Sequence, residues 1–235
     1  MKPLAGRLTA TGLVMSLALS LGVVPAAADS SPSALPVTVT PATGHGDTLA
    51  VFYSGDGGWV ASDVGMTADL VKAGIPVVGV NSLRYFVARK TPEESAADLA
   101  ALLRRDMSAW GKTRIVLGGY SFGASALALI VPHLPADLRS HIRLIALVDP
   151  ATSGELQFWP GDWLNVAARS ATPIAPALAK LKGIPMICIS GADEPDAACL
   201  SLASDHIRSV RVPGGHHYGG HYEGVSRAIL AALPR

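Results

Sequence analysis

The sequence has no surplus of charge of either sign. Its 19 Lys and Arg residues face 18 Asp and Glu residues, which gives a formal net charge of +1. Residues 1–28 contain two basic residues and no acidic ones, so their removal would leave 17 basic against 18 acidic residues. A protein that holds nucleic acid through its phosphates needs a basic surface. This balance therefore argues against a nucleic-acid partner.

Long apolar runs are missing after the N-terminal region. Lys2 and Arg7 precede the apolar stretch 13–24, and small residues follow at 26–28. This is the pattern of a cleavable signal peptide over residues 1–28, so we expect an exported protein. An uncleaved anchor is the alternative, although the stretch is short for a span of about 20 residues. No cysteine follows it, which argues against a lipoprotein anchor.

Cysteine is scarce, since Cys188 and Cys199 are the only two in the chain. In an exported protein an even pair of cysteines predicts a disulfide, which here would close a short loop. Two free thiols are the alternative, because the sequence does not give the separation of their Cα atoms.

The histidine patterns H-x-H and H-E-x-x-H are absent, although PGGHHYGGHY (213–222) holds three of the seven histidines. A zinc site needs three or four ligands in a closed or nearly closed shell. Adjacent side chains such as His216 and His217 tend to point apart. We therefore predict no metal and no cofactor.

The sequence does contain an alternation of apolar runs and helical patterns. Most of the runs lack polar alternation, which is typical of strands buried on both faces of a parallel sheet. This predicts the α/β class, with a doubly wound, mostly parallel sheet in one domain over residues 47–235. Residues 29–46 are expected to be a leader with an edge strand at 35–39. The predicted strands are 49–53, 75–80, 115–117, 142–148, 184–189 and 210–212, and the clear helices follow a capping box at 91–94 or cover 121–131 and 222–233.

The sharpest motif is Gly119-Tyr120-Ser121-Phe122-Gly123, which fits G-x-S-x-G. A predicted strand leads into it and a predicted helix leaves it, as a nucleophile elbow requires. The sharp turn would lift the Ser121 hydroxyl above the sheet, at the N-terminal end of the helix. We therefore predict Ser121 to be a nucleophile, which needs a histidine base and an acid to orient that base.

The candidate acids follow the predicted strand 184–189. Three carboxylates compete in this turn, and by resemblance to hydrolases with G-x-x-D at this point Glu194 occupies the acid position. Asp196 is the main alternative, whereas Asp193 is expected to be a solvated turn residue. Asp149, at the end of the predicted strand 142–148, is a more distant alternative.

The base is expected in the loop after the last predicted strand. His217 lies four residues after Pro213, and this P-G-x-x-H spacing precedes the last helix in many such hydrolases. The spacing favours His217 as the base, with His216 as the alternative. His221 begins the predicted final helix and is expected at the rim.

A glycine-rich loop, Ser54–Trp59, follows the predicted strand 49–53. Such a loop can bring backbone N–H groups to a developing oxyanion, as can the residue after the nucleophile. We therefore predict an oxyanion hole made by the backbone of Phe122 and of Asp56 or Gly57. A plain glycine turn is the alternative.

With these residues placed, the chain resembles bacterial virulence proteins of the VirJ family and the C-terminal domain of AcvB. The matching stretches are collinear over roughly residues 48–231. They are FYSGDGGW (52–59), PVVGVNSLRYF (76–86), RKTPEESAAD (89–98), GGYSFGAS (118–125), the segment 188–199 and VPGGHHYGGHY (212–222).

The resemblance implies a periplasmic protein with an α/β-hydrolase fold and no large cap. AcvB-like members are associated with hydrolysis of lysyl-phosphatidylglycerol, and VirJ-like members are linked to type IV secretion. The implied partners are thus an aminoacylated phospholipid at the membrane surface and secretion-system proteins. For such a substrate, Arg84 and Arg89 are candidates to grip the lipid phosphate, and Trp59 to line a groove. Structural roles, a salt bridge for Arg84 and core packing for Trp59, are the alternatives.

Three functions follow from these patterns. The first is a serine esterase acting on aminoacyl-phosphatidylglycerol. The second is a carboxylesterase or thioesterase of another specificity with the same triad. The third is a non-catalytic interaction protein, against which the presence of Ser121, an acid and a histidine argues.

Overall fold

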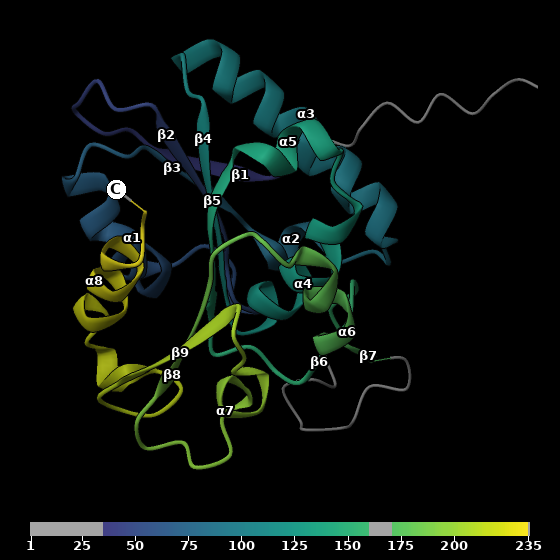
Figure 1. Cartoon of the computed structure of the whole chain (residues 1–235), viewed down its shortest axis with the longest axis vertical. Coiled ribbons are helices and arrows are strands. Elements are labelled where there is room, and N and C mark those ends of the chain that lie inside the picture. The colour runs from purple at the N-terminus through teal and green to yellow at the C-terminus, as the bar shows by residue number, and fades with distance from the viewer. Residues whose placement is uncertain (1–34, 160–170, 235) are drawn as a thin grey trace, which may run out of the picture. The chain divides into compact units, whose positions relative to one another are not determined.

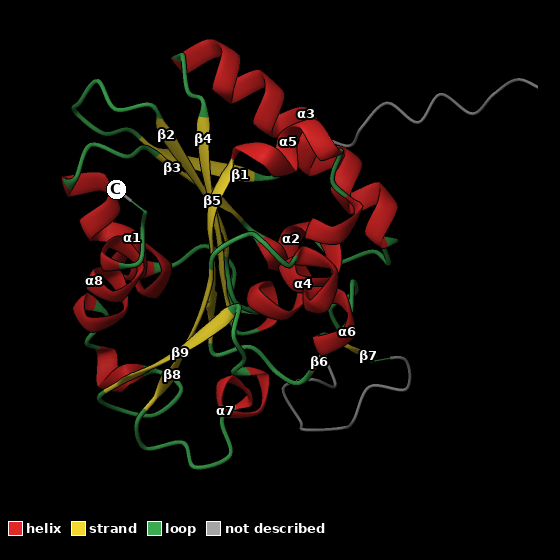
Figure 2. Ribbon diagram, viewed as in Figure 1, coloured by secondary structure: helices red, strands yellow, loops and turns green. Residues whose placement is uncertain are grey.

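The computed structural model describes residues 35–159 and 171–234, in which a seven-stranded sheet carries helices on both faces (Figure 1, Figure 2). Its strands follow the order β1-β3-β2-β4-β5-β8-β9, and every neighbouring pair is parallel except β1 with β3. The predicted α/β class with a mostly parallel sheet is confirmed. The strands are β1 Val37–Thr40, β2 Thr48–Tyr53, β3 Val77–Val80, β4 Arg114–Tyr120, β5 Ile142–Val148, β8 Met186–Gly191 and β9 Ile207–Val212.

Two hydrophobic clusters separate the two faces of the sheet. On one face Met66 and Leu70 pack with Val225 and Ile229 from the last helix. The other face buries a larger cluster, to which the long helix and the helix after β4 contribute. The helices are α1 Ala61–Lys72, α2 Ser82–Tyr85, α3 Pro92–Trp110, α4 Phe122–Ile130, α5 Ala136–His141, α6 Ala175–Leu178, α7 Ala198–Leu202 and α8 Glu223–Ala231.

The start and the end of α3 follow directly from its sequence. The Glu94 N–H donates to Thr91 Oγ1 at 3.1 Å, and the Thr91 N–H donates to Glu94 Oε2 at 2.8 Å, which forms the predicted capping box. At the other end Gly111 takes a φ of 61°, a left-handed conformation that suits glycine and stops the helix.

The N-terminal segment contributes to the sheet. β1 pairs antiparallel with β3 and forms one edge, close to the edge strand predicted at 35–39. The sheet therefore starts ten residues before residue 47, where the domain was predicted to begin. The predicted signal peptide, residues 1–28, lies outside the described residues.

The predicted disulfide is present between Cys188 of β8 and Cys199 of α7, with 5.3 Å between the Cα atoms. Both residues are fully buried. The bond closes the loop that carries Glu194, and so it ties that loop to the middle of β8. Across residues 35–159 and 171–234, no helix combines the length and the apolar character needed to cross a bilayer.

Candidate active site

Ser121 occupies a strained turn between β4 and α4. Its φ is 51° and its ψ is −116°, values that a residue with a side chain rarely adopts. The turn is compact because the flanking residues are glycines. A Cβ on Gly119 would lie 2.7 Å from the carbonyl carbon of Gly123, and a Cβ on Gly123 would lie 2.2 Å from Ser54 O. The predicted elbow geometry is confirmed, and it presents the Ser121 side chain to a pocket.

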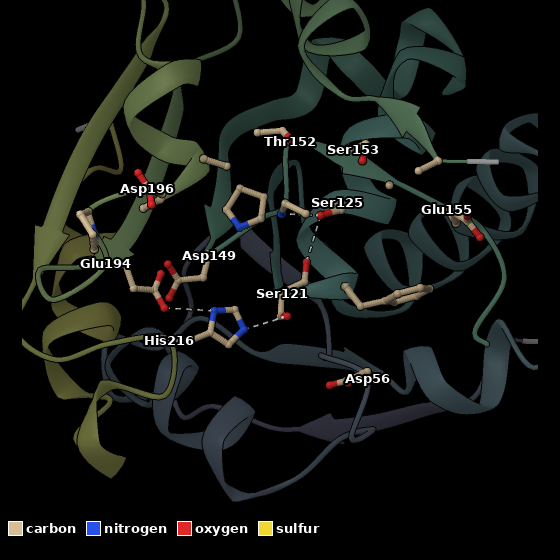
Figure 3. Close-up of a pocket in the computed structure, with 18 of the residues that line it drawn as sticks. Asp56, Ser121, Ser125, Asp149, Thr152, Ser153, Glu155, Glu194, Asp196 and His216 are labelled. Carbon is tan, nitrogen blue, oxygen red and sulfur yellow. Dashed lines mark hydrogen bonds and ion pairs between the residues drawn. The ribbon is translucent and has the colours of Figure 1, made fainter. Parts of the chain in front are cut away.

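His216 is the histidine that faces Ser121. Its Nε2 lies 3.0 Å from Ser121 Oγ (Figure 3). His217, which the spacing favoured, is exposed, and its Nδ1 lies 2.9 Å from the Tyr120 hydroxyl. The structure therefore brings His216, the alternative, and not His217 to Ser121, which corrects the predicted base.

The course of the loop after β9 explains this correction. Gly214 takes a φ of 101°, so the chain turns back sharply after Pro213. The carbonyl of Gly214 accepts the N–H of Asp193 at 3.0 Å, which fixes the loop against the turn after β8. The loop thus reaches Ser121 one residue earlier than the P-G-x-x-H spacing implies. His221 lies beyond a short 3-10 helix, Tyr218–Gly220, and is exposed.

The carboxylate of Glu194 lies next to Nδ1 of His216, the ring nitrogen that does not face Ser121. Its Oε1 lies 3.6 Å from His216 Nδ1, an ion-pair distance. Asp193 and Asp196 line the same pocket but are exposed, and among the described residues neither pairs with His216. Of the three acids in the turn, Glu194 alone is half-buried and directed at the imidazole.

The electrostatics of His216 suit a proton acceptor. Burial lowers the pKa of its imidazole, and the negative charge of Glu194 partly opposes this effect. The ring is therefore neutral around pH 7. In this state Nε2 can accept a proton from Ser121 while Nδ1–H points to Glu194.

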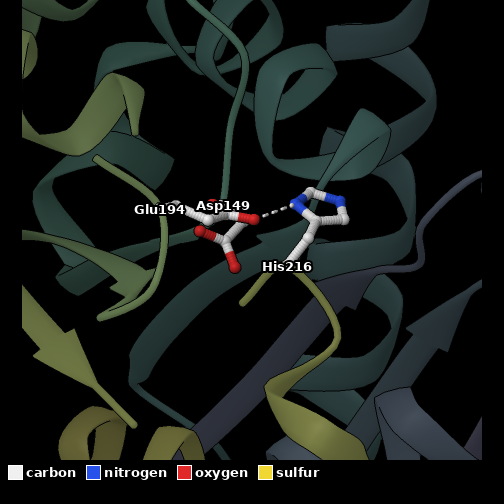
Figure 4. Close-up of side chains that lie close together, drawn as sticks. All are labelled: Asp149, Glu194 and His216. Atoms are coloured by element: carbon white, nitrogen blue, oxygen red, sulfur yellow. Dashed lines mark ion pairs between the residues drawn. The ribbon is translucent and has the colours of Figure 1, made fainter. Parts of the chain in front are cut away.

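Asp149 lies beside Glu194, although it comes from another strand end. It follows β5, is only 4% exposed, and donates its backbone N–H to Ile189 O at 2.7 Å. One carboxylate oxygen of Asp149, one of Glu194 and one ring nitrogen of His216 all lie within 4.8 Å of one another (Figure 4). Burial raises the pKa of Asp149 to about 7, against the lowering effect of the Tyr218 hydroxyl and with a further increase from the charge of Glu194.

These three side chains could each offer one atom to a cation. However, both nitrogens of His216 already face protein partners, Ser121 on one side and Glu194 on the other. The arrangement therefore suits the passage of a proton along the imidazole better than the binding of an ion.

A pocket of about 1060 Å³ opens over Ser121, and we call it the serine pocket. Phe122 and Phe158 supply apolar wall, with 6.4 Å between their ring centroids. The described lining residues include no Lys or Arg. They do include six carboxylates, from Asp56, Asp149, Glu155, Asp193, Glu194 and Asp196.

Two of the three residues predicted for the oxyanion hole line the serine pocket. Asp56 and Phe122 line the serine pocket with Ser121, whereas Gly57 is not among its lining residues. The loop after β2 passes close over the elbow, since a Cβ on Gly55 would lie 3.8 Å from Ser121 Cβ. This loop leads into α1, where the N–H of Val60 donates to Asp63 Oδ2 at 3.1 Å.

The predicted substrate-binding residues are only partly placed at a pocket. Trp59 stacks over β3, so close that a Cβ on Gly79 would lie 2.3 Å from its ring, and it packs edge-on to Phe52. It is a packing residue, which corrects its predicted role. Arg84 is exposed on α2 and lines neither the serine pocket nor the one described next, so its role in substrate binding stays a prediction.

Arg89 lines a second, smaller pocket of about 410 Å³ that adjoins the serine pocket and shares Gly154 and Glu155 with it. We call it the basic pocket, because Arg89, Lys90, His133 and Lys180 all line it. The Nε of Arg89 donates to Gln157 Oε1 at 3.1 Å, which holds the guanidinium at the wall. Arg89 was predicted from the sequence as a phosphate ligand, whereas Lys180, which lies far from it in the chain, was not.

A parallel sheet covered on both faces, with a serine elbow after a central strand and a histidine after the last strand, defines an α/β-hydrolase fold. Solved structures share it at low identity. Est1E from Butyrivibrio proteoclasticus matches with a TM-score of 0.60 and 16% identity, over 83% of this chain and 93% of that one. An alpha-beta serine hydrolase homologue from Coxiella burnetii matches with a TM-score of 0.56 and 16% identity, over 84% and 91%.

The chain belongs to the family described as bacterial virulence protein (VirJ), whose model matches residues 47–235. This confirms the family expected from the sequence. Carboxylesterase Culp1 of Mycobacterium tuberculosis is 31% identical over 88 residues, which are 36% of this chain. The match spans 41% of the length of that relative.

Proposed function

We propose that the protein is a serine esterase in which Ser121 is the nucleophile, His216 the base and Glu194 the residue that orients the base. The observation that carries this proposal is the 3.0 Å separation of Ser121 Oγ and His216 Nε2. As Oγ bonds to the ester carbonyl carbon, Nε2 takes the hydroxyl proton. The imidazolium then gives that proton to the departing alcohol, and water releases the acyl group by the same steps.

The developing negative charge on the carbonyl oxygen needs donors that are already in place. We assign this role to the backbone N–H of Phe122, in the first turn of α4, and to the backbone of Asp56. Both residues line the serine pocket. The positive end of the α4 dipole adds to the stabilisation.

The lining of the serine pocket supports a substrate with a cationic acyl group. Six acidic residues line the space next to Ser121, with no Lys or Arg among the described lining residues. An aminoacyl ester carries an ammonium group near its carbonyl, and a lysyl ester carries a second one. We therefore propose aminoacyl esters, with lysyl-phosphatidylglycerol as the foremost candidate.

The basic pocket supports an anionic group on the alcohol side of the same substrate. It adjoins the serine pocket through Gly154 and Glu155, and its wall carries Arg89, Lys90 and Lys180. A phosphodiester fits such a set of cations. The substrate is then presented at the surface of a membrane outside the cytoplasm, a location with which the Cys188–Cys199 disulfide is compatible.

The deciding experiment compares the purified protein with Ser121→Ala on vesicles that contain lysyl-phosphatidylglycerol. We expect release of lysine by the wild type and none by the variant, together with labelling of Ser121 by a fluorophosphonate probe. Hydrolysis of p-nitrophenyl acetate without hydrolysis of the lipid would leave an esterase of another specificity. Absence of both activities and of labelling would leave an interaction protein of the secretion machinery.

The two halves of the proposed substrate can be tested separately. Lys180→Gln should raise KM for the lysyl lipid but not for p-nitrophenyl acetate, since only the lipid carries a phosphate. Lys182→Gln is the matched control, because Lys182 is exposed two residues away and does not line the basic pocket. Equal effects of the two substitutions would contradict the phosphate assignment.

A further inference from the structure

Two carboxyl groups, not one, approach the imidazole of His216. Glu194 lies on the exposed side, with 27% of its side chain accessible, whereas Asp149 is 4% exposed. Figure 4 shows the two carboxyl groups side by side near the same edge of the ring. The proposed mechanism uses one of them, so the buried Asp149 has no assigned task.

Asp149 is fixed in place by the ends of two strands. Its backbone takes a φ of 44°, an uncommon value for an aspartate, and its N–H bonds to the last part of β8 at Ile189 O. Its Oδ1 accepts the Gly191 N–H at 3.4 Å. Hydrogen bonds of both its backbone and its side chain to β8 thus fix the position of the Asp149 carboxyl group.

Among the described residues, no Lys or Arg faces Asp149 to balance a negative charge on it. The titratable groups that face it are Tyr120 at the end of β4, Glu194 after β8, His216 after β9 and Tyr218 in the 3-10 helix that follows His216 and His217. None of these is a Lys or Arg, and no Lys or Arg is among the described residues that line the pocket. Two carboxylates this close in a half-buried site do not both ionise easily, so one retains a proton near neutral pH.

Burial decides which of the two retains the proton. The neutral form is favoured where water is excluded, and Asp149 is the more buried of the pair. The pKa of about 7 for Asp149 agrees with this assignment. A neutral carboxyl group is a hydrogen-bond donor, whereas an ionised one is only an acceptor.

We propose that Asp149 is a positioning residue that, as a neutral acid, donates its O–H to the Glu194 carboxylate and thereby holds Glu194 against Nδ1 of His216. This rests on the proposed Ser121–His216–Glu194 esterase. The donated hydrogen bond fixes one oxygen of Glu194, so that the other remains directed at the imidazole. Ionisation of Asp149 at alkaline pH removes the donor and sets two like charges against each other.

The test measures kcat for p-nitrophenyl acetate from pH 5 to pH 9 with the full chain. Asp149→Asn keeps a donor, so we expect near wild-type kcat at pH 6.5 and loss of the decline above pH 7 that the wild type shows. Asp149→Ala should lower kcat by about 10- to 100-fold at pH 6.5, the effect of losing a hydrogen bond to a charged group. Asp205→Asn is the control, because it removes an exposed carboxylate that does not line the serine pocket.

Two outcomes would overturn the assignment. If Asp149→Asn loses as much activity as Glu194→Gln, Asp149 is itself the charged residue that orients His216. If Asp149→Asn shows the pH profile of the wild type, no proton on Asp149 matters. The first outcome would replace Glu194 by Asp149 as the orienting acid, but neither outcome affects Ser121 as the nucleophile and His216 as the base. That part of the proposal fails separately if Ser121→Ala stays active. Thermal unfolding of each variant identifies a loss of folding, and Asp149→Asn keeps the test decisive if Asp149→Ala is unstable.

Discussion

The Tyr120 hydroxyl lies 2.9 Å from Nδ1 of His217, whereas His216 Nε2 lies 3.0 Å from Oγ of Ser121, the residue next to Tyr120 in the chain. Two adjacent histidines therefore have separate partners: His216 has Ser121 in the serine pocket, and His217 has Tyr120, which does not line that pocket. The separation can be tested at the level of activity.

Substitution of the two histidines should give very unequal effects. We expect His216→Ala to lower kcat by roughly 10⁴-fold or more, because the base of a triad acts together with its nucleophile. His217→Ala removes the contact to Tyr120 and an edge contact with the ring of His216, and it should change kcat by no more than a few-fold because neither contact involves Ser121. Ester hydrolysis by both purified variants is the measurement. A larger loss of kcat with His217→Ala than with His216→Ala would show that His217, which the P-G-x-x-H spacing favoured, is the base.

The disulfide should contribute to both stability and activity. We expect the double variant Cys188→Ala/Cys199→Ala to lose about 2–3 kcal/mol in the free energy of unfolding, because an open loop gains entropy in the unfolded chain. Its kcat should also fall, since the closed loop carries Glu194. Urea unfolding and ester hydrolysis measure the two effects. Unchanged kcat would mean that packing alone positions Glu194.

Asp63 should make the protein less stable as the pH rises. It is 1% exposed, and burial raises its pKa from 3.8 to about 6, against backbone hydrogen bonds that lower it. Between about pH 4 and pH 6 the folded state thus binds more protons than the unfolded state, so the free energy of unfolding falls as the pH rises through this window.

Asp63→Asn should remove this dependence while keeping an acceptor for the Val60 N–H. We expect the variant to gain up to about 3 kcal/mol relative to the wild type at pH 8, and little at pH 4. Urea unfolding at both pH values is the measurement. A difference that does not change with pH would show that the charge of Asp63 is already compensated.

The close packing of the elbow predicts the effect of a single methyl group. Gly123→Ala should cost at least about 1–3 kcal/mol and disturb Ser121, because the new Cβ would meet Ser54 O at 2.2 Å. Gly46→Ala is the matched control, since a Cβ there would have no heavy atom within 4 Å. Thermal unfolding and fluorophosphonate labelling measure both effects. Similar results for the two variants would contradict the packing argument.

The parts of the molecule that the sequence predicted well are those in which local pattern and chemistry agree. The helix after Thr91 is capped by residues only three positions apart in the sequence. The serine elbow likewise needs glycines at fixed positions next to Ser121. The buried strands are marked by unbroken apolar runs. Because the sequence has two cysteines, only one intramolecular disulfide was possible, between Cys188 and Cys199.

The predictions that were wrong or missing concern residues whose position depends on the path of a loop or on a contact between residues that are distant in the sequence. His216 and His217 differ by one position, and the turn at Gly214, with its φ of 101°, determines which one reaches Ser121. Trp59 looked suited to a groove, but its place over Gly79 depends on how β3 packs. The approach of Asp149 to Glu194 requires the neighbouring placement of β5 and β8, which only the order of the strands in the sheet provides.

The bond between Cys188 and Cys199 also sets a condition on when the site is complete. Such a bond persists in an oxidising compartment and is rare in a reducing one. Before oxidation the segment with Glu194 lacks this covalent link and is held by hydrogen bonds and packing, so the carboxylate of Glu194 is less firmly held. If the protein is the proposed esterase, a newly made copy in a reducing compartment would therefore hydrolyse its substrate only weakly until the disulfide forms.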